Sequence, residues 1–246
     1  MDYDRLMATT YDPIYADVRT PSGDRDFYVA QAVAAGGPVL ELGCGTGRIL
    51  LGVAAHGIEI TGVDPSEAML DVLRSKSPPA NVTLVRGRME ELDLADHGFA
   101  LAMVPFRAFM HLLTVEAQLA ALARIREHLR PGGKLVFDVF DPNPTRMGLA
   151  EEPEAHDHWF ELDGKRVERR YEIRRDRATQ VMQVTFRYYD AEGAALGEEL
   201  IGMRWTWRYE LEHLLVRAGF TPLSWSSGYD GRPYDGSGDI VVVARR

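Results

Sequence analysis

Residues 39–50 read VLELGCGTGRIL, and they constrain the fold of this chain more strongly than any other stretch. The first four, Val39–Leu42, suit a short strand. Glycines then follow at every second position, Gly43, Gly45 and Gly47, before a helical pattern begins. A strand that passes through a glycine-rich turn into a helix is typical of doubly wound α/β sheets, in which ligands bind beyond the carboxyl ends of the strands. The stretch therefore predicts such a sheet, with a ligand that approaches the backbone of the turn.

Short apolar runs alternate with helical patterns as far as residue 141. Further strands are expected at residues 58–63, 82–85, 99–104 and 135–140, and helices at residues 24–35, 47–56, 66–75 and 115–129. In the last helix, Leu119, Leu122 and Ile125 recur at helical spacing. Repeated strand and helix predicts a mostly parallel sheet with right-handed crossovers.

From about His158 the pattern changes to extended segments of period two, separated by turn signals at residues 163–164 and 192–193. This pattern predicts an antiparallel sheet of three or four strands, after which a helix and two strands return the chain to the parallel sheet. We expect four regions: an N-terminal cap at residues 1–36, a ligand-binding core at 37–150, an antiparallel lid at 151–205, and a closing helix and strands at 206–246.

Composition narrows the class of partner. The chain has 246 residues, 46% of them hydrophobic, and a formal net charge of -9, which would repel a nucleic acid backbone. The single cysteine, Cys44, cannot form an internal disulfide, and the acidic N-terminal segment does not resemble a signal peptide. No apolar run approaches the roughly 20 residues that span a bilayer. We therefore expect a cytoplasmic protein that binds small molecules, and neither nucleic acid nor membrane.

The spacing of the glycines and two acidic residues indicate the kind of ligand. The turn reads G-x-G-x-G, whereas the dinucleotide fingerprint reads G-x-G-x-x-G. Asp64, at the end of the second expected strand, stands about 20 residues further on, where a carboxylate can accept both hydroxyls of a ribose. Glu41 places a second carboxylate beside the turn, which opposes a pyrophosphate and favours an ammonium or sulfonium group. The pattern favours a cationic adenosine ligand over NAD.

Three segments in this order resemble the class I S-adenosylmethionine-dependent methyltransferases: ELGCGTGR at residues 41–48, GVDPSEAML at 62–70 and LRPGGKLVFDVF at 129–140. The resemblance is strongest over residues 39–140, and its nearest type is the small-molecule N-methyltransferases that act on glycine or amino sugars. It implies a seven-stranded, mostly parallel, Rossmann-like sheet with an inserted antiparallel β lid, and S-adenosylmethionine as the cofactor.

The resemblance also assigns roles in binding the cofactor. The backbone at Gly43, Gly45 and Gly47 would approach the methionine portion, and Asp64 would hold the ribose hydroxyls. Met69 resembles the apolar residue that flanks the adenine, although its spacing with Leu70 and Leu73 also suits the core. The family often has an aspartate that accepts the adenine amino group, at a position where this chain reads Arg88, Met89 and Glu90. Arg88 cannot accept a hydrogen bond, so Glu90 or the backbone of Met89 would replace it.

The segment after the fourth expected strand is similar to the acceptor-facing loop of small-molecule N-methyltransferases. Within it, His111 is a candidate base or positioning residue, or a histidine at a helix start that bonds the backbone or the cofactor carboxylate. Arg107 is a candidate for binding an acidic acceptor, or for pairing with Glu90 or Glu91.

The N-terminal segment resembles the part of these enzymes that folds over the cofactor, ahead of the first helix. In it, Tyr11 and Tyr15 are expected to line the pocket or to anchor the following helix, and Arg19 is a candidate partner of the cofactor carboxylate. The acidic and histidine residues near His156 and His158 have no matching cluster elsewhere, so we expect no metal site.

The sequence therefore predicts a methyltransferase that acts on a nitrogen or oxygen of a small molecule, with nitrogen preferred. Two other classes stay open at this point: a nicotinamide-dependent oxidoreductase, and a non-catalytic module that binds S-adenosylmethionine. An exposed lid strand favours pairing of two copies, so a homodimer through the lid is the assembly to expect.

Overall fold

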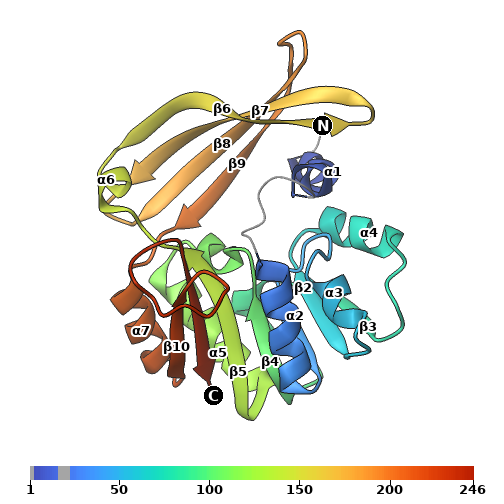
Figure 1. Ribbon diagram of the computed structural model, residues 1–246, viewed down its shortest axis with the longest axis vertical. Coiled ribbons are helices and arrows are strands. Elements are labelled where there is room, and N and C mark those ends of the chain that lie inside the picture. The colour runs from blue at the N-terminus through green and yellow to red at the C-terminus, as the bar shows by residue number, and fades with distance from the viewer. Residues whose placement is uncertain (1–2, 16–22) are drawn as a thin grey trace.

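A computed structural model describes residues 3–15 and 23–246 of the chain. Its main sheet has seven strands in the order β10-β11-β5-β4-β1-β2-β3, and its second sheet has four, β6-β7-β8-β9 (Figure 1). Strands β1 to β5 pair in parallel, while β11 is antiparallel to both β5 and β10. This is the mostly parallel, doubly wound sheet with an inserted antiparallel lid that the sequence predicts.

The strands of the main sheet are β1 (Val39–Leu42), β2 (Ile60–Asp64), β3 (Val82–Arg86), β4 (Phe99–Val104), β5 (Leu129–Phe140), β10 (Thr221–Ser227) and β11 (Asp239–Arg245). Its helices are α2 (Asp24–Ala35), α3 (Leu50–Ala54), α4 (Glu67–Ser75), α5 (Val115–His128) and α7 (Arg208–Arg217), with short 3-10 turns η1 (Met89–Glu91) and η2 (Ala108–His111). Ser66 caps α4, since its Oγ accepts a hydrogen bond from the Met69 amide at 3.3 Å.

The central strands are apolar on both faces because helices cover both. On one face, Val39 and Leu101 pack in a cluster with residues of α2, α3 and α4. On the other, Leu40 and Ala102 pack with residues of α5 and α7. A strand buried on both sides reads as an apolar run, which is why β4 was visible in the sequence; in β1 the buried Glu41 interrupts the run.

Helix α1 (Tyr3–Tyr15) was not expected, because the segment around Tyr11 and Tyr15 was placed ahead of the first helix. The helix forms because tertiary contacts hold it on two sides. Leu6 and Ile14 join a buried cluster with lid residues, and Asp12 bonds to the core. Pro13 has no N–H and cannot donate a helical hydrogen bond to the residue four positions earlier, so these tertiary contacts must offset that loss.

The lid consists of β6 (Glu151–Leu162), β7 (Lys165–Asp176), β8 (Val181–Asp190) and β9 (Ala195–Arg204), and a short helix, α6 (Pro144–Met147), connects it to β5. Its turns fall at Asp163-Gly164 and near Gly193, as predicted. Figure 1 shows the lid above the carboxyl ends of the core strands, with α1 between the two sheets.

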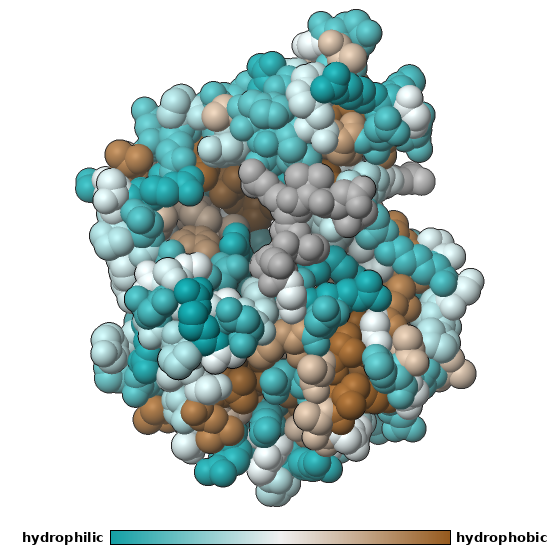
Figure 2. Space-filling model, viewed as in Figure 1, coloured by the Kyte–Doolittle hydropathy of each residue, from teal (hydrophilic) through white to brown (hydrophobic). Residues whose placement is uncertain are grey.

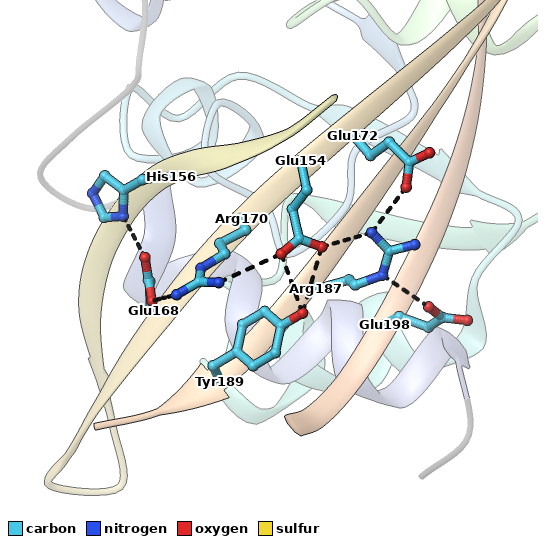
Figure 3. Close-up of polar contacts among 8 residues, drawn as sticks. All are labelled: Glu154, His156, Glu168, Arg170, Glu172, Arg187, Tyr189 and Glu198. Carbon is cyan, nitrogen blue, oxygen red and sulfur yellow. Dashed lines mark hydrogen bonds and ion pairs between the residues drawn. The ribbon is translucent and has the colours of Figure 1, made fainter. Parts of the chain in front are cut away.

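The outer face of the lid is charged. Figure 3 shows Arg170 and Arg187 surrounded by carboxylates: Glu154 lies 2.8 Å from Arg187 Nη1, and Glu168 lies 2.9 Å from Arg170 Nη2. His156 Nδ1 lies 2.8 Å from the same Glu168. The arginines of this face are thus matched by glutamates. Among the described residues, no group of three or more His, Cys, Asp or Glu side chains could hold a metal ion.

Within residues 3–15 and 23–246, no helix is both long and apolar enough to cross a bilayer.

Candidate active site

The glycine turn after β1 lies at the carboxyl edge of the main sheet, and its backbone is in the left-handed region. The φ angles are 72° at Gly43, 52° at Gly45 and 87° at Gly47. A side chain at Gly47 would collide with Leu73 of α4, so that glycine allows close helix packing. A side chain at Gly45 would meet no atom within 4 Å of the chain. Gly45 is therefore the point at which a ligand can approach the backbone.

Asp64 ends β2 and is bound to the same turn. Its Oδ2 accepts a hydrogen bond from the Gly45 amide at 2.8 Å, and its Oδ1 accepts one from the Ser66 amide at 2.9 Å. The side chain is mostly buried, and these two bonds fix the direction of the carboxylate. Each carboxylate oxygen can accept a further hydrogen bond, as the assigned contacts with two ribose hydroxyls require.

Glu41 lies one residue before the end of β1 and is fully buried, on the sheet face that α2 and α3 cover. Burial raises the pKa of its carboxyl to about 8, with Arg48 lowering it and Asp64 raising it further. Its Oε2 has no hydrogen bond partner among the described residues. A buried carboxyl with an unsatisfied oxygen is suited to a cationic ligand group, which would favour its ionised form.

The four residues assigned to the adenine differ in how deeply they are buried. Met69 is buried at the start of α4, whereas Arg88 is exposed and pairs with Glu90, whose Oε1 lies 2.7 Å from Arg88 Nε. Met89 is half-buried and packs against the core. The adenine contacts of Met69, Arg88, Met89 and Glu90 stay a prediction.

Helix α1 joins the glycine turn to the lid. Thr46, within the turn, donates a hydrogen bond from Oγ1 to Asp12 Oδ1 at 2.6 Å, and Lys76 lies 2.5 Å from the other oxygen of Asp12. On the opposite side, Leu6 and Ile14 pack with lid residues such as Tyr188. The helix thus fixes the lid relative to the turn.

The predicted pocket tyrosines form an aromatic cluster beside the turn. The rings of Tyr11 and Tyr15 have centroids 4.6 Å apart, and the ring of Phe106 lies 5.1 Å from that of Tyr15. Burial, together with the proximity of Tyr15, raises the pKa of the Tyr11 hydroxyl, and Arg48 opposes the shift. Arg48 also lies 4.9 Å from the Phe106 ring centre. Arg19, the proposed partner of the cofactor carboxylate, falls outside the described residues.

The segment that follows β4 contains two consecutive residues with positive φ, Phe106 at 55° and Arg107 at 65°. This conformation is costly for both residue types and indicates a functional turn. The fully buried carboxylate of Asp138 holds it, since its oxygens accept hydrogen bonds from the Phe106 amide at 2.8 Å and the Arg107 amide at 2.9 Å. Tyr28 donates a further bond to Asp138 at 2.5 Å. Burial raises the pKa of Asp138 to about 6.

Arg107 does not pair with Glu90 or Glu91, as one reading of the sequence had it. Its Nη2 lies 2.8 Å from Oδ1 of Asp239, the first residue of β11. The pairing arises because β11 lies next to β5, so Asp239 reaches the carboxyl edge of the sheet from a distant part of the chain. Arg107 also borders the cavity described below.

His111 ends η2, and its Nδ1 lies 3.1 Å from the carbonyl oxygen of Gly202 in β9. A carbonyl can only accept, so Nδ1 carries the proton and Nε2 has the free lone pair. The ring is accessible at its surface, but the surrounding chain desolvates it and lowers its pKa. His111 is therefore neutral at pH 7, and its Nε2 can accept a proton.

A cavity of about 390 Å³ lies between the lid and the carboxyl ends of β4 and β5. Figure 2 shows it as a hollow lined by hydrophobic residues between the upper and lower parts of the molecule. Its core wall includes Phe140 and Asp141, and its lid wall includes Ile173, Met182 and Val184. Its volume is in the range of small-molecule sites.

Sequence reasoning missed several residues of this cavity. Asp141 directly follows β5, and an acidic residue at the carboxyl end of a core strand was a usable signal. Arg175, Phe186 and Asp157 belong to the lid, and only the folding of the lid over the core brings them to the site. His111 is not among the lining residues, but Gly202, which it contacts, immediately precedes Met203 in the cavity wall.

Comparisons with known proteins agree with this geometry. A family model described as a methyltransferase domain matches residues 39–133, which include the glycine turn and Asp64. A cypemycin N-terminal methyltransferase from a Streptomyces species is 30% identical over 140 residues, which cover 57% of this chain and 57% of that protein. A ubiquinone biosynthesis O-methyltransferase from Alkalilimnicola ehrlichii is 31% identical over 121 residues, 48% of each chain. The chain spans about half the length of the curated relatives it matches.

Among solved structures, the CcbJ methyltransferase from Streptomyces caelestis superposes with a TM-score of 0.79 at 28% identity, covering 92% of this chain and 96% of that one. Over residues 39–133 the chain thus matches a methyltransferase domain, and its fold is similar to that of a solved methyltransferase over most of its length. An amino pentose methyltransferase from Micromonospora echinaspora, solved with S-adenosylmethionine bound, has a TM-score of 0.69 at 25% identity, covering 93% of this chain and 92% of that one.

The residues present are compatible with S-adenosylmethionine. The buried, unsatisfied carboxyl of Glu41 would suit its cationic methionine portion, and the open space at Gly45 would admit that portion. Asp64, whose direction is fixed by two backbone amides, would suit the ribose hydroxyls. Cys44 is buried, and burial raises the pKa of its thiol, so it is unsuited to act as a nucleophile.

Proposed function

We propose that this protein transfers the methyl group of S-adenosylmethionine to a nitrogen of a small-molecule amine. The observation that carries the proposal is the cavity of about 390 Å³, which opens between lid and core at the same sheet edge as Glu41, Gly45 and Asp64. A cavity of this size admits a small acceptor. The names of two similar proteins, an N-terminal methyltransferase and an amino pentose methyltransferase, support nitrogen as the acceptor atom.

When bound, S-adenosylmethionine supplies an activated methyl group. The chain supplies binding and position: the turn at Gly45 and the carboxylates of Glu41 and Asp64 would hold the cofactor. The aromatic cluster of Tyr11 and Tyr15 would keep water away, because it covers the turn from the side of α1. Holding two reactants in line in a dry pocket accounts for much of the acceleration in reactions of this kind.

The acceptor nitrogen must present a lone pair, so it must be neutral when it reacts. His111 has its free lone pair at Nε2 and a lowered pKa, and we assign it the removal or positioning of the amine proton. The Arg107 guanidinium pairs with Asp239, and the Arg107 backbone amide donates a hydrogen bond to Asp138. It thus shapes the floor of the cavity rather than offering a free charge.

Release of S-adenosylhomocysteine in the presence of small amines tests the proposal. The panel pairs each amine with the alcohol of the same carbon skeleton, so that size and polarity are matched. We expect turnover with members of the amine series and little with their alcohols. Turnover with alcohols alone would refute the assignment of nitrogen, and turnover with neither series, by a protein that binds the cofactor, would favour the non-catalytic module.

A further inference from the structure

Arg175 of β7 is a buried cation in the lid wall of the cavity. Its side chain is only 1% exposed, and its Nη2 donates to Glu152. Its Nε and Nη1 have no hydrogen bond partner anywhere in the described parts of the chain. Buried guanidinium donors without partners are costly, so they indicate a group that the site is built to receive.

The charges around Arg175 do not balance. Glu152, its acid partner, is shared with Arg146, whose Nη2 lies 2.8 Å from the other carboxylate oxygen. Both arginines lower the pKa of Glu152, which is therefore ionised. Two guanidinium groups and one carboxylate leave one net positive charge at this end of the cavity.

The other charged groups of the cavity have partners of their own. Asp157 accepts a hydrogen bond from Arg169 at 2.8 Å, and Asp141 accepts one from the hydroxyl of Tyr234 at 3.0 Å. Arg107, the residue that the sequence suggested for an acidic acceptor, pairs with Asp239. Arg175 is thus the cation of the cavity wall with donors left over.

We propose that Arg175 binds a carboxylate group of the methyl acceptor. The proposal rests on the proposed function, since it names the class of acceptor for the same cavity. One net positive charge suits a monoanion better than a phosphate dianion. A buried hydrogen bond between a guanidinium N–H and a carboxylate is stronger than one between neutral groups.

Strand register separates Arg175 from the aromatic cluster beside the glycine turn. Arg175 stands opposite Met182 of β8, and Phe186 lies four residues further along that strand, a distance of about 13 Å. At the Phe186 end, Arg169 lies 4.3 Å from the Phe186 ring centre and 5.6 Å from that of Tyr15, in the cluster beside the glycine turn.

The wall between these two ends is apolar, with Ile173 and Val184 among its residues. An acceptor that reaches from Arg175 to the cluster beside the glycine turn would be an elongated molecule with an amine at one end, an apolar body, and a carboxylate at the other end.

Calorimetric titration of the full chain, saturated with S-adenosylhomocysteine, tests the proposal without requiring turnover. The probes are an aminomethyl-biphenyl carboxylate, with its amine and carboxylate at opposite para ends, and the corresponding primary amide. We expect the carboxylate to bind the wild-type protein about 10- to 100-fold more tightly than the amide. Equal affinities would overturn the proposal, and tighter binding of the matching phosphonate would overturn the assignment of a carboxylate.

Variants on one strand locate the effect. Arg175→Met should remove the preference for the carboxylate, and Arg175→Lys should restore part of it, since the charge returns. Arg174→Met is the matched control: Arg174 is adjacent on β7, but its side chain is 72% exposed on the opposite face and pairs with Glu172. A preference that survives in Arg175→Met, or disappears equally in Arg174→Met, would overturn the role of Arg175.

Failure of this proposal is distinguishable from failure of the proposed function. Selective binding of the carboxylate without methylation of any amine would keep the Arg175 site and refute methyl transfer. Equal rates of amine methylation for the carboxylate probe and the amide probe, with the same equality in Arg175→Met, would keep the methyltransferase proposal and refute the Arg175 site. The comparison of the two probes on wild-type protein needs no variant, so it remains decisive if Arg175→Met fails to fold.

Discussion

Glu41 should release a proton when the free protein binds S-adenosylmethionine. Burial raises its pKa to about 8, and a carboxyl with that pKa is about nine-tenths protonated at pH 7. A cationic ligand group beside the carboxyl favours the ionised form. Binding therefore returns the pKa of Glu41 toward its ordinary range, and about 0.9 protons leave the site.

Calorimetry at pH 7 in two buffers of different ionisation enthalpy counts these protons. Glu41→Gln is the control, because it keeps the shape of the side chain but cannot titrate. The ammonium group of the ligand titrates in both proteins and cancels in the difference. Wild-type protein should release about 0.9 more protons per site than Glu41→Gln. Equal proton counts would refute the placement of a ligand cation at Glu41.

The same residue makes the stability of the free protein depend on pH. The folded-state pKa of Glu41, about 8, lies above the ordinary value of 4.5, so the folded chain keeps a proton that the unfolded chain loses. Its contribution to the free energy of unfolding is full below pH 4.5 and is lost as the pH rises through 8. The whole difference corresponds to about 5 kcal/mol.

Urea unfolding at high and low pH measures this effect. Glu41→Gln should be more stable than wild-type protein at about pH 9, where the wild-type carboxylate is buried and ionised. The two proteins should have similar stability at about pH 4, where Glu41 is protonated in the folded state. A variant that is less stable than wild type at high pH would contradict the raised pKa.

Three further substitutions test the site. Asp64→Ala should weaken binding of S-adenosylmethionine about 100-fold through loss of the ribose contacts. Asp71→Ala, at an exposed position on α4, is the control and should leave the affinity unchanged. Unchanged calorimetric affinity in Asp64→Ala would remove the ribose assignment. Asp138→Ala should lower the free energy of unfolding by about 2–4 kcal/mol, because two backbone amides and the Tyr28 hydroxyl lose their acceptor. An unchanged free energy of unfolding in urea would contradict the role of Asp138 in holding the turn after β4. His111→Ala should lower kcat more than it weakens cofactor binding. It should also remove the decline of kcat in acid that protonation of the imidazole causes, at a pH below the ordinary range for histidine because the pKa is lowered. A larger effect on cofactor affinity would make His111 a cofactor ligand.

The cofactor half of the site was predictable because its signals are local. The strand before Gly43, the glycines themselves and Asp64 lie within two neighbouring strand ends, and parallel pairing of β1 with β2 brings them together. The position of Glu41 beside the turn could be predicted for the same reason. Its raised pKa could not be predicted, because it results from burial under α2 and α3, which the sequence does not quantify.

The acceptor half depends on contacts between distant segments. Arg107 was visible as a charged residue after β4, but its partner Asp239 stands 132 residues further along the chain. Asp138 read as one polar residue in an apolar strand, and only the structure shows that it anchors a strained turn. Arg175 lies in a strand with several charged residues, and its inward direction depends on the register of the lid.

The protein's central activity is tested most directly by following a deuterated methyl group. The protein is incubated with S-adenosylmethionine carrying the label and with the panel of small amines, and the products are analysed by mass spectrometry. We predict that at least one amine gains the labelled methyl group on nitrogen, in step with the formation of S-adenosylhomocysteine. A protein that binds the cofactor and yet transfers the label to none of the amines would contradict the proposal of a small-molecule N-methyltransferase.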